Sequence, residues 1–454
     1  MNIIIVGGGK VGYSVAETLS AEGHDITMID QNAAAIERIS NALDVICVQG
    51  SAANPETLQA ARVAEADLLL AATEKDEVNM ICGIAAHRLG ARHVVARIRD
   101  PEYLHQGAFL KETMGLSLIV NPEYECAREI SRMLHFPSAV RVDTFSNGSV
   151  EIVDHRIPEG GKLAGMTLRE LPQTIGAKVL VVMVERGGEA LIPRGDFVLR
   201  PGDRLSISGS NAELRRFFAR IGQYRRPVKT VMLMGGGRIA VYLTRMLLES
   251  GVAVTIIERD AALCERLCDL VPGATVVCGD ATRNDVMNEE GLSRSDAFVT
   301  LTGDDGDNII TSLYARSSGV PKIITKVNRE LFNGLLEGAG LDSTVSPKAL
   351  VAQQLTAYVR ALSASRGGGM ESLHRLADGK AEALEFLVDE SSRLAHKALR
   401  ELKLKKNVLI SAVIRGGKSL IPDGNTALLP GDHAVVVSLA GRLTALDQIL
   451  EGER

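Results

Sequence analysis

The chain contains two copies of one pattern, and this repeat restricts the possible folds more than any other feature of the sequence. Four pairs of segments correspond at a nearly constant offset of 228 or 229 residues: NIIIVGGGKVG with TVMLMGGGRIA (2–12, 230–240), VQGSA with VCGDA (48–52, 277–281), ADLLLAATEKDEVN with SDAFVTLTGDDGDN (66–79, 295–308), and GGEALIPRGDFVLRPGDRLSISG with GGKSLIPDGNTALLPGDHAVVVS (187–209, 416–438). Agreement over such a length predicts two copies of a single structural unit.

The first part of each copy alternates short apolar runs with amphipathic segments. This alternation is typical of a parallel sheet with helices on both faces. In the first copy we expect strands near 2–6, 25–30, 44–48, 67–72, 93–97 and 117–120, and a last helix from about 123 to 135. The predicted fold class is α/β, with two Rossmann-like, doubly wound parallel sheets, each followed by a small α+β subdomain.

The second part of each copy has runs with a period of two, such as VEIVDHRI and VLVVMVE, separated by Gly-Gly and Pro-Gly-Asp turns. These patterns predict hairpin strands. We expect a helix to close each small subdomain, over 211–220 and 441–450. The predicted domains are 1–137 and 229–365 for the Rossmann-like parts, and 138–222 and 370–454 for the subdomains that follow them.

A glycine fingerprint follows the first strand and opens a helix, which is the context in which such a loop binds a dinucleotide. Gly7 permits a tight turn, Gly9 lets the backbone approach a pyrophosphate, and Gly12 permits close contact between helix and strand. Amide groups from about Lys10 onward would face the phosphates. Asp30, at the end of the next strand, would accept the ribose hydroxyls and repel a 2′-phosphate, which favours NAD(H) or an adenine nucleotide over NADP.

The second copy departs from this pattern in small ways. Ala240 replaces the third glycine, and Glu258 is a longer acid than Asp30. Arg259 beside it could tolerate an additional phosphate. The second copy could therefore bind a nucleotide, or keep the fold without a ligand, and the sequence leaves both readings open.

Three further pairs of polar residues follow strands at the edge where open α/β sheets bind ligands. They are Ser51 and Asp280 after the third strand, Thr73 and Thr302 after the fourth, and Arg97 and Lys326 at the end of the fifth. The serine and aspartate could meet an adenine edge, and the two cations could reach a phosphate or a carboxamide. Loop capping and surface charge are equally good explanations for these residues.

Catalytic and metal-binding motifs do not emerge from the sequence. The nine histidines are scattered, and none in the first copy faces a histidine in the second. We therefore expect neither catalytic residues nor a metal site, and binding without turnover. A formal charge of −5 offers no basic field for nucleic acid. No apolar run reaches the roughly 18 residues of a membrane span, and the first residues lack the basic region of a signal peptide.

The motifs GGGKVG…MID, VQGSAANPETL, TEKDEVNMICG and GDFVLRPGDRL resemble those of the RCK (KTN) domain family, which regulates potassium channels and transporters. Two such units in one chain are similar to the peripheral subunits of the bacterial Trk potassium-uptake system. The resemblance implies a homotetrameric ring of RCK domains at the cytoplasmic face of the membrane. Its partner would be a membrane-embedded potassium transporter of the TrkH/TrkG type, and NAD(H), ATP or ADP would bind in its clefts and change its shape.

The family's motifs also place the expected binding residues on this sequence. They are Gly7, Gly8, Gly9, Lys10, Val11, Gly12, Asp30, Ser51, Ala52, Thr73 and Arg97 in the first copy, and Gly235, Gly236, Gly237, Arg238, Ile239, Glu258, Asp280, Ala281, Thr302 and Lys326 in the second. Ser51 departs from the Gly-Asp-Ala form of the second copy, which puts an adenine contact there in question. The alternatives are an NAD-dependent oxidoreductase and an RCK-type regulator of another channel or transporter.

Overall fold

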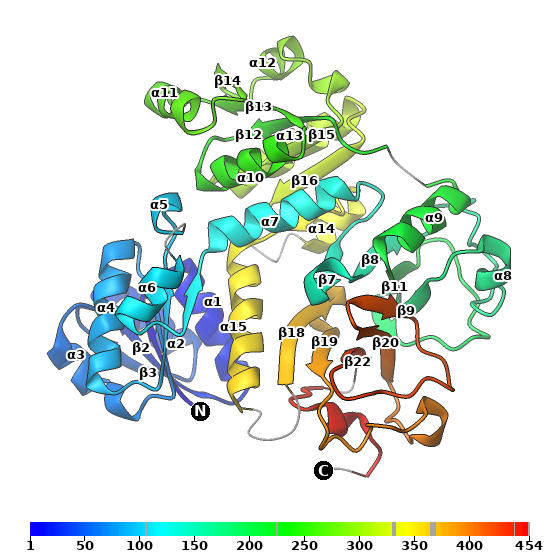
Figure 1. Ribbon diagram of the computed structural model, residues 1–454. Helices are drawn as coiled ribbons and strands as arrows, with labels where there is room; N and C mark the ends of the chain where they lie inside the picture. The colour runs from blue at the N-terminus through cyan, green and yellow to red at the C-terminus, as the bar shows by residue number, and fades with distance from the viewer. Residues whose placement is uncertain (105–106, 224–225, 329–332, 364–368, 440, 453–454) are drawn as a thin grey trace. The chain divides into compact units, whose positions relative to one another are not determined.

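The computed structural model describes residues 1–454 except 105–106, 224–225, 329–332, 364–368, 440 and 453–454 (Figure 1). The described residues form two units that do not coincide with the two sequence repeats. One unit combines Met1–Ser131 with Val228–Thr356, and the other combines Arg132–Pro227 with Ala357–Arg454. Each unit thus takes the corresponding part of both repeats.

The first unit contains two six-stranded parallel sheets with the same strand order, β3-β2-β1-β4-β5-β6 and β14-β13-β12-β15-β16-β17. This is the order of the doubly wound dinucleotide-binding fold, so the predicted fold class is confirmed. The strands of the first sheet are β1 (Asn2–Val6), β2 (Asp25–Asp30), β3 (Ile46–Gln49), β4 (Leu68–Ala71), β5 (His93–Arg97) and β6 (Leu118–Val120). Those of the second are β12 (Thr230–Met234), β13 (Ala253–Glu258), β14 (Thr275–Cys278), β15 (Ala297–Thr300), β16 (Lys322–Lys326) and β17 (Thr344–Val345).

Helices connect these strands. In the first copy they are α1 (Lys10–Ala21), α2 (Ala33–Ala42), α3 (Pro55–Ala60), α4 (Asp76–Leu89), α5 (Pro101–Leu104), α6 (Gly107–Met114) and α7 (Pro122–His135). In the second they are α10 (Arg238–Glu249), α11 (Ala261–Leu270), α12 (Asn284–Glu289), α13 (Asp305–Ser317), α14 (Asn333–Gly338) and α15 (Pro347–Ser363).

Burial explains why these apolar runs form the middle of the sheets. All four residues of β4 (LLLA) are buried, as are the last four of β1 (NIIIV), because helices cover both faces of a parallel sheet. The edge strand β3 (ICVQ) has no fully buried residue. Side-chain caps mark where helices begin: Asn32 accepts a hydrogen bond from the Ala34 amide at 2.9 Å, and Asp260 accepts one from the Leu263 amide at 3.1 Å.

The second unit contains two five-stranded antiparallel sheets, ordered β10-β9-β11-β8-β7 and β18-β19-β22-β20-β21. The first comprises β7 (Val142–Phe145), β8 (Val150–Arg156), β9 (Leu180–Arg186), β10 (Glu189–Leu191) and β11 (Arg204–Gly209), with α8 (Leu171–Ile175) and α9 (Asn211–Ile221). The second comprises β18 (Gly369–Leu376), β19 (Ala381–Leu387), β20 (Val408–Arg415), β21 (Lys418–Leu420) and β22 (His433–Ser438).

These two sheets share one apolar core. Phe145, Val150 and Met183 of the first sheet belong to the same buried cluster as Ala383 and Val435 of the second. Polar contacts accompany the cluster. The Nδ1 atom of His374 lies 2.9 Å from Asp143 Oδ1, and Asp143 has its pKa lowered to about 2, because the nearby Arg141 and His374 outweigh the effect of its burial. The second parts of the two repeats thus pack as one body.

The predicted closing helix is present in only one of the two copies. In the first, α9 begins after Ser210, whose hydroxyl accepts a hydrogen bond from the Glu213 amide. The prediction of a helix over 441–450 is wrong: the chain there forms only a short 3₁₀ turn, Leu446–Ile449. The right-handed helical backbone is interrupted twice in this range, at Gly441 with a φ of +89° and at Ala445, which is extended with φ −140° and ψ 150°.

Candidate functional site

The first glycine-rich loop joins β1 to α1, and its glycines have different surroundings. Gly7 has a φ of +106°, and a Cβ atom there would lie 2.7 Å from the carbonyl oxygen of Ala72. A Cβ atom on Gly12 would lie 1.9 Å from the carbonyl oxygen of Gly7. Neither position has room for a side chain. A Cβ atom on Gly9, by contrast, would meet nothing within 4 Å, so the backbone there borders open space.

Asp30 ends β2 and holds this loop in place. Its Oδ2 atom accepts a hydrogen bond from the Gly8 amide at 2.6 Å, and its Oδ1 atom accepts one from the Asn32 amide at 2.8 Å. The guanidinium of Arg38 on α2 donates to the carbonyl oxygen of Gly8 at 3.0 Å. The predicted acid therefore lies beside the predicted phosphate loop.

The second loop has the same design with a longer acid. Gly235 has a φ of +98°. The Gly236 amide donates to Glu258 Oε2 at 2.7 Å, and the Arg259 amide donates to the other carboxylate oxygen at 2.8 Å. Ala240, at the third glycine position, is fully buried, so this copy accommodates one methyl group where the first accommodates none. No described side chain caps the amino terminus of α1 or of α10.

The polar residues after the third strand of each sheet form hydrogen bonds within the loops to which they belong. The Ala53 amide donates to the exposed Ser51 hydroxyl at 3.4 Å. Asp280 accepts hydrogen bonds from the amide and the hydroxyl of Thr282, at 2.9 and 2.8 Å, and these bonds lower the pKa of its carboxyl group. Ala52 and Ala281 lie buried beneath these turns. Capping is therefore the role that the structure describes for Ser51 and Asp280.

A buried asparagine, which is not among the residues predicted from the sequence, joins the ends of the fourth and fifth strands. Asn79 of α4 has no exposed surface. Its Oδ1 atom accepts hydrogen bonds from the amide and hydroxyl of Thr73, at 2.8 and 2.7 Å, and its Nδ2 atom donates to the Arg97 carbonyl oxygen at 2.8 Å. Asn308 repeats this arrangement around Thr302 in the second copy. The aligned segments of the repeat both end on this asparagine, and that was its signal in the sequence.

The two cations that end the fifth strands already have partners. The Arg97 guanidinium lies 3.2 Å from Glu123 Oε1, and the Lys326 ammonium donates to the Thr302 carbonyl oxygen at 2.7 Å. Burial lowers the pKa of both Arg97 and Lys326. These side chains stabilise the switch-point edge of each sheet from within.

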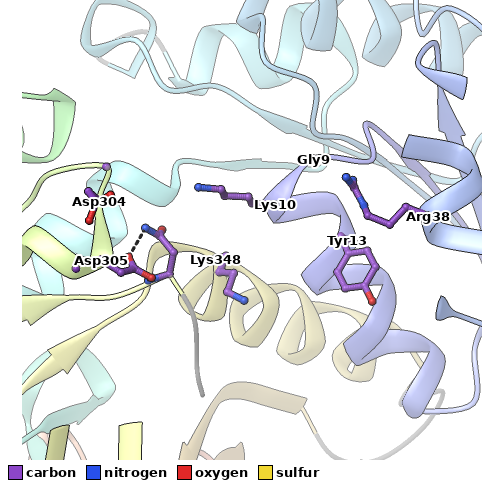
Figure 2. Close-up of a pocket in the computed structure, with 10 residues that line it drawn as sticks. Gly9, Lys10, Tyr13, Arg38, Asp304, Asp305 and Lys348 are labelled. Atoms are coloured by element: carbon purple, nitrogen blue, oxygen red, sulfur yellow. Dashed lines mark hydrogen bonds between the residues drawn. The ribbon is translucent and has the colours of Figure 1, made fainter. Parts of the chain in front are cut away.

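A cavity of about 710 Å³ lies in the first unit, between the first glycine loop and the segment that follows β15 (Figure 2). Its lining residues come from both repeats: Gly9, Lys10, Tyr13, Arg38, Gly303, Asp304, Asp305, Gly306, Asn328 and Lys348. Three of them are cations, two from the first repeat and one from α15. Figure 2 shows Lys10 extending from the start of α1 toward the side of the cavity on which Asp304 lies. The volume falls within the range of small-molecule sites.

The two aspartates that line this cavity, Asp304 and Asp305, have different hydrogen-bond partners. Asp304 caps α13 by accepting a hydrogen bond from the Asp307 amide at 3.0 Å. Asp305 instead accepts hydrogen bonds from Asn328, from its amide at 2.9 Å and from its side chain at 2.8 Å. The loop after β15 is thereby tied to the end of β16, so this wall of the cavity is held by the fold.

Comparison with known proteins assigns the chain to a family. The TrkA-N domain matches residues 3–122 and 231–347, and the TrkA-C domain matches residues 152–222 and 383–450. The chain belongs to the TrkA family. It is 33% identical, over 99% of its length and 100% of the relative's, to "Trk system potassium uptake protein TrkA homolog" of Archaeoglobus fulgidus. The tandem RCK arrangement expected from the repeat is confirmed.

Solved structures share the fold of this TrkA-family chain. "GsuK channel bound to NAD" matches 100% of the chain and 79% of its own length, with a TM-score of 0.62 and 20% identity. "Crystal structure of the GsuK bound to ADP" matches 79% of the chain and 69% of its own length, with a TM-score of 0.52 and 17% identity.

The family is one of non-catalytic regulatory subunits, so the expectation that the chain is not an enzyme is confirmed. The alternative of an NAD-dependent oxidoreductase is accordingly set aside. Among the described helices, none combines the length and apolar character needed to cross a membrane.

Proposed function

We propose that this TrkA-family chain is a nucleotide-sensing regulatory subunit at the cytoplasmic face of the membrane. It binds NAD(H), ATP or ADP and regulates a membrane-embedded potassium-uptake protein of the TrkH/TrkG type. The observation that carries the proposal is the cavity beside Gly9. It combines an uncapped helix start with three cations, and Asp30, which binds the glycine loop at Gly8, supplies an acid next to that loop.

The chemistry of this cavity matches an adenosine-linked phosphate. The α1 amides and the Lys10, Arg38 and Lys348 side chains offer positive charge to phosphate oxygens. Asp30 retains lone pairs for ribose hydroxyls besides the two amides that it already binds. Its negative charge disfavours a 2′-phosphate, so NAD(H) is preferred over NADP. The relatives of known structure that were solved with NAD and with ADP support both ligand types.

The binding residues proposed for the first copy are those predicted from the sequence, and Gly9, Lys10 and Asp30 are central among them. The second loop repeats the acid-to-amide bond of the first through Glu258, and we propose that it forms a second site. Arg97 in the first site and Lys326 in the second act by holding the strand ends in place, because their charged groups are already partnered.

A shared cavity suggests how binding becomes regulation. Because its walls come from both repeats, a ligand there contacts the first glycine loop and the segment after β15 together. A ligand shifts a conformational equilibrium only by its difference in affinity for the two states. A difference of about 1–3 kcal/mol changes the equilibrium roughly 5–150-fold. NADH, ATP and ADP would differ in effect to the extent that each favours one spacing of the two walls.

Paired substitutions test the assignment of the two acids. We expect Asp30→Asn to weaken nucleotide binding at one site by about 10–100-fold, since a hydrogen bond to a charged group contributes about 1.5–3 kcal/mol. Asparagine can still accept the Gly8 hydrogen bond through its one amide oxygen, and it loses the bond from the Asn32 amide. Glu258→Gln is the matched variant in the second copy. Titration calorimetry of the full chain with NADH, NAD, ATP and ADP measures both, and unchanged affinities in both variants would reject the proposal.

The variant Lys348→Ala tests whether this lysine contacts the ligand or only contributes to the stability of the fold. The residue lies in the first turn of α15, where a positive charge opposes the helix dipole. Its removal should leave stability unchanged or slightly increased, yet lower the affinity for ATP about tenfold through loss of a charge-assisted contact. Thermal melts and ATP titrations of the same sample give both quantities. An unaltered ATP affinity would exclude this lysine from the site.

A repeated apolar surface supports the proposed homotetramer. Ile81 and Ile84 of α4 are 52% and 41% exposed, and Ile310 and Leu313 occupy the equivalent places on α13 at 68% and 38%. Residues three apart on a helix share one face. The exposed Phe109 of α6 extends the set, and Leu335 of α14 does so in the second copy. Each chain thus presents two similar apolar faces, which suits a ring in which every chain contacts two neighbours.

Charging these faces should break the assembly. We expect the wild-type protein to have four times the chain mass of 48.6 kDa, and a variant with both Ile81→Asp and Ile310→Asp to have a smaller mass. Light scattering after size-exclusion chromatography measures both. Val198→Asp, at a 43% exposed residue in the other unit, is the control. A double variant that keeps the wild-type mass would show that these helices are not the interface.

A further inference from the structure

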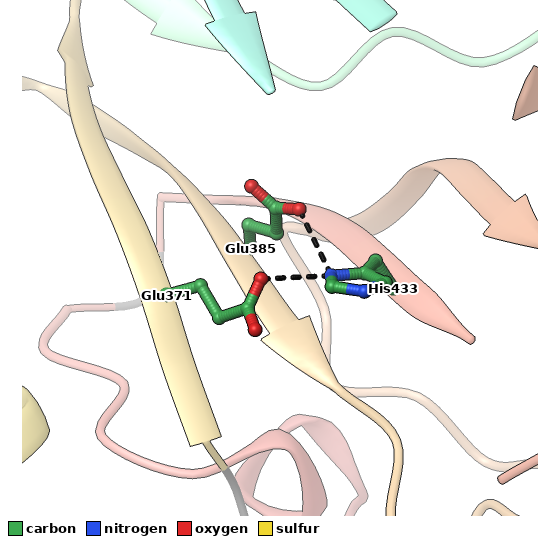
Figure 3. A group of neighbouring side chains, drawn as sticks. All are labelled: Glu371, Glu385 and His433. Carbon is green, nitrogen blue, oxygen red and sulfur yellow. Dashed lines mark ion pairs between the residues drawn. The ribbon is translucent and has the colours of Figure 1, made fainter. Parts of the chain in front are cut away.

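Three side chains with metal-ligating atoms meet on one face of the second antiparallel sheet (Figure 3). Glu371, Glu385 and His433 come from β18, β19 and β22, which are neighbours in that sheet. The Nδ1 atom of His433 lies 2.8 Å from Glu371 Oε2 and 3.1 Å from Glu385 Oε1. One ligand atom from each residue lies within 4.8 Å of the other two. Neither the glycine motifs nor the nucleotide cavity involves these residues.

The first repeat provides an internal comparison. In its sheet, Arg204 is paired with Arg156, and Ser206 with Asp154. The second repeat has the same register, in which His433 is paired with Leu387, and Val435 with Glu385. His433 therefore stands where Arg204 does, and Glu385 where Asp154 does. In the first repeat the guanidinium lies 3.0 Å from the buried carboxylate and neutralises it permanently. The second repeat replaces this fixed cation with an imidazole and adds another carboxylate.

A β-bulge brings the additional carboxylate into place. The pairing of β18 with β19 shifts register between Met370 and Ser372, and Glu371 is the extra residue. Ser372 is paired with Glu385 and donates a hydrogen bond to it at 3.1 Å. In a regular strand, side chains alternate between the two faces, so the residue next to Ser372 would point to the face opposite Glu385. The bulge changes the direction of the Glu371 side chain, so that its carboxylate lies near His433 Nδ1, as the carboxylate of Glu385 does.

The histidine nitrogen in the middle of this group has an unusual environment. His433 Nδ1 is buried and, within the part of the chain that the structure describes, makes no hydrogen bond, although two carboxylate oxygens are close to it. One ring N–H could serve only one of those oxygens well. An ion bound to Nδ1 in place of that proton would have both carboxylate oxygens close to it. Ligands at about 2.1 Å from a tetrahedral ion are about 3.4 Å apart, so the observed spacings need only a small expansion.

The carboxylate of Glu385 is positioned as a ligand would be. Its side chain is only 4% exposed. Besides Ser372, the amide and hydroxyl of Ser146 donate hydrogen bonds to its two oxygens. Such outer partners orient metal-binding carboxylates. Ser146 belongs to the first repeat, so the group lies where the two antiparallel sheets of this unit meet. Glu371 is 43% exposed, which leaves one side of the group open to water.

We propose that Glu371, Glu385 and His433 form a binding site for a divalent transition-metal ion of the Zn²⁺ class. The ligand atoms are His433 Nδ1, Glu385 Oε1 and Glu371 Oε2, and water completes the coordination on the open side. One imidazole nitrogen with two carboxylates suits zinc and its neighbours. Calcium and magnesium prefer all-oxygen sites. By linking three strands beside Ser146, the ion would stabilise the pairing of the two antiparallel sheets.

Zinc binding by the full-length protein tests the proposal. After treatment with a chelator, the wild-type chain should take up one equivalent of Zn²⁺ in calorimetry, and its melting temperature should rise with Zn²⁺. Glu371→Gln keeps the shape of a partly exposed side chain and should weaken the affinity more than about 100-fold, since even outer partners contribute 10–100-fold. His433→Arg restores the pairing of the first repeat and should abolish uptake without loss of the metal-free fold, which circular dichroism verifies.

The control is His396→Asn, which removes an exposed histidine 3.8 Å from Glu390 in the same subdomain. Its backbone has a φ of +62°, which asparagine tolerates. This variant should bind Zn²⁺ as the wild type does. Absence of stoichiometric uptake by the wild-type chain, or equal uptake by Glu371→Gln and His433→Arg, would overturn the proposal. Mg²⁺ or Ca²⁺ binding as tightly as Zn²⁺ would overturn its assignment to a transition-metal ion.

Discussion

Gly12→Ala is expected to abolish nucleotide binding at the first site and to destabilise the first unit by about 3 kcal/mol, the upper end of the usual cost of overpacking. The added methyl group would lie 1.9 Å from the Gly7 carbonyl oxygen. Gly7 cannot retreat, because it already packs closely on the backbone of Ala72. The loop must therefore move outward, into the space beside Gly9 where the phosphates would lie.

The second copy provides the control for this variant, since its equivalent residue is already an alanine. Ala240→Gly should leave nucleotide affinity at the first site unchanged. ATP and NADH titrations of both variants, with thermal melts, distinguish the two outcomes. If Gly12→Ala binds nucleotides with wild-type affinity, the first glycine loop does not form the site.

Asn79→Leu is expected to lower the free energy of unfolding by about 4 kcal/mol, more than Gly12→Ala does. The substitution nearly preserves volume, but it leaves the Thr73 amide and the Arg97 carbonyl oxygen without their partner in a buried place. Each unsatisfied buried group costs about 1–3 kcal/mol. Chemical denaturation of the full chain measures the loss.

Two further variants make this result interpretable. Asn308→Leu should have a similar effect in the second copy, because the same hydrogen bonds recur there. Asn288→Ala removes an exposed asparagine that donates to the Tyr314 hydroxyl, and should change stability by less than about 0.5 kcal/mol. A neutral Asn79→Leu variant would mean that water or local rearrangement satisfies the two strand ends.

The parallel sheets and the glycine loops could be predicted because each depends on local sequence. Apolar runs between amphipathic helices specify buried strands, and an acid after the second strand lies beside the loop whenever strands one and two pair in parallel. Asp30 and Glu258 occupy these positions. The partners of Arg97 and Lys326 were not predictable. Glu123 is 26 residues from Arg97, and only the packed fold brings the two together.

The grouping of parts from both repeats could not be predicted for a related reason. It depends on which sheet faces are complementary, as in the shared core around Phe145 and Val435. A repeat also misleads where its copies diverge at one residue. In the second copy the backbone at Gly441 and Ala445 is not helical, so the closing helix is absent, and the bulge at Glu371 adds a carboxylate beside Glu385.

The common core of the two antiparallel sheets has a consequence for a chain that carries both repeats. Separate half-length polypeptides would have to find one another in solution, and their pairing would weaken on dilution. Here each half is tethered to its mate, at an effective concentration set by the linker. The tether also frees the halves to differ. Two identical subunits must carry the same residue at matching places, whereas one fused chain keeps Arg204 in one half and His433 in the other.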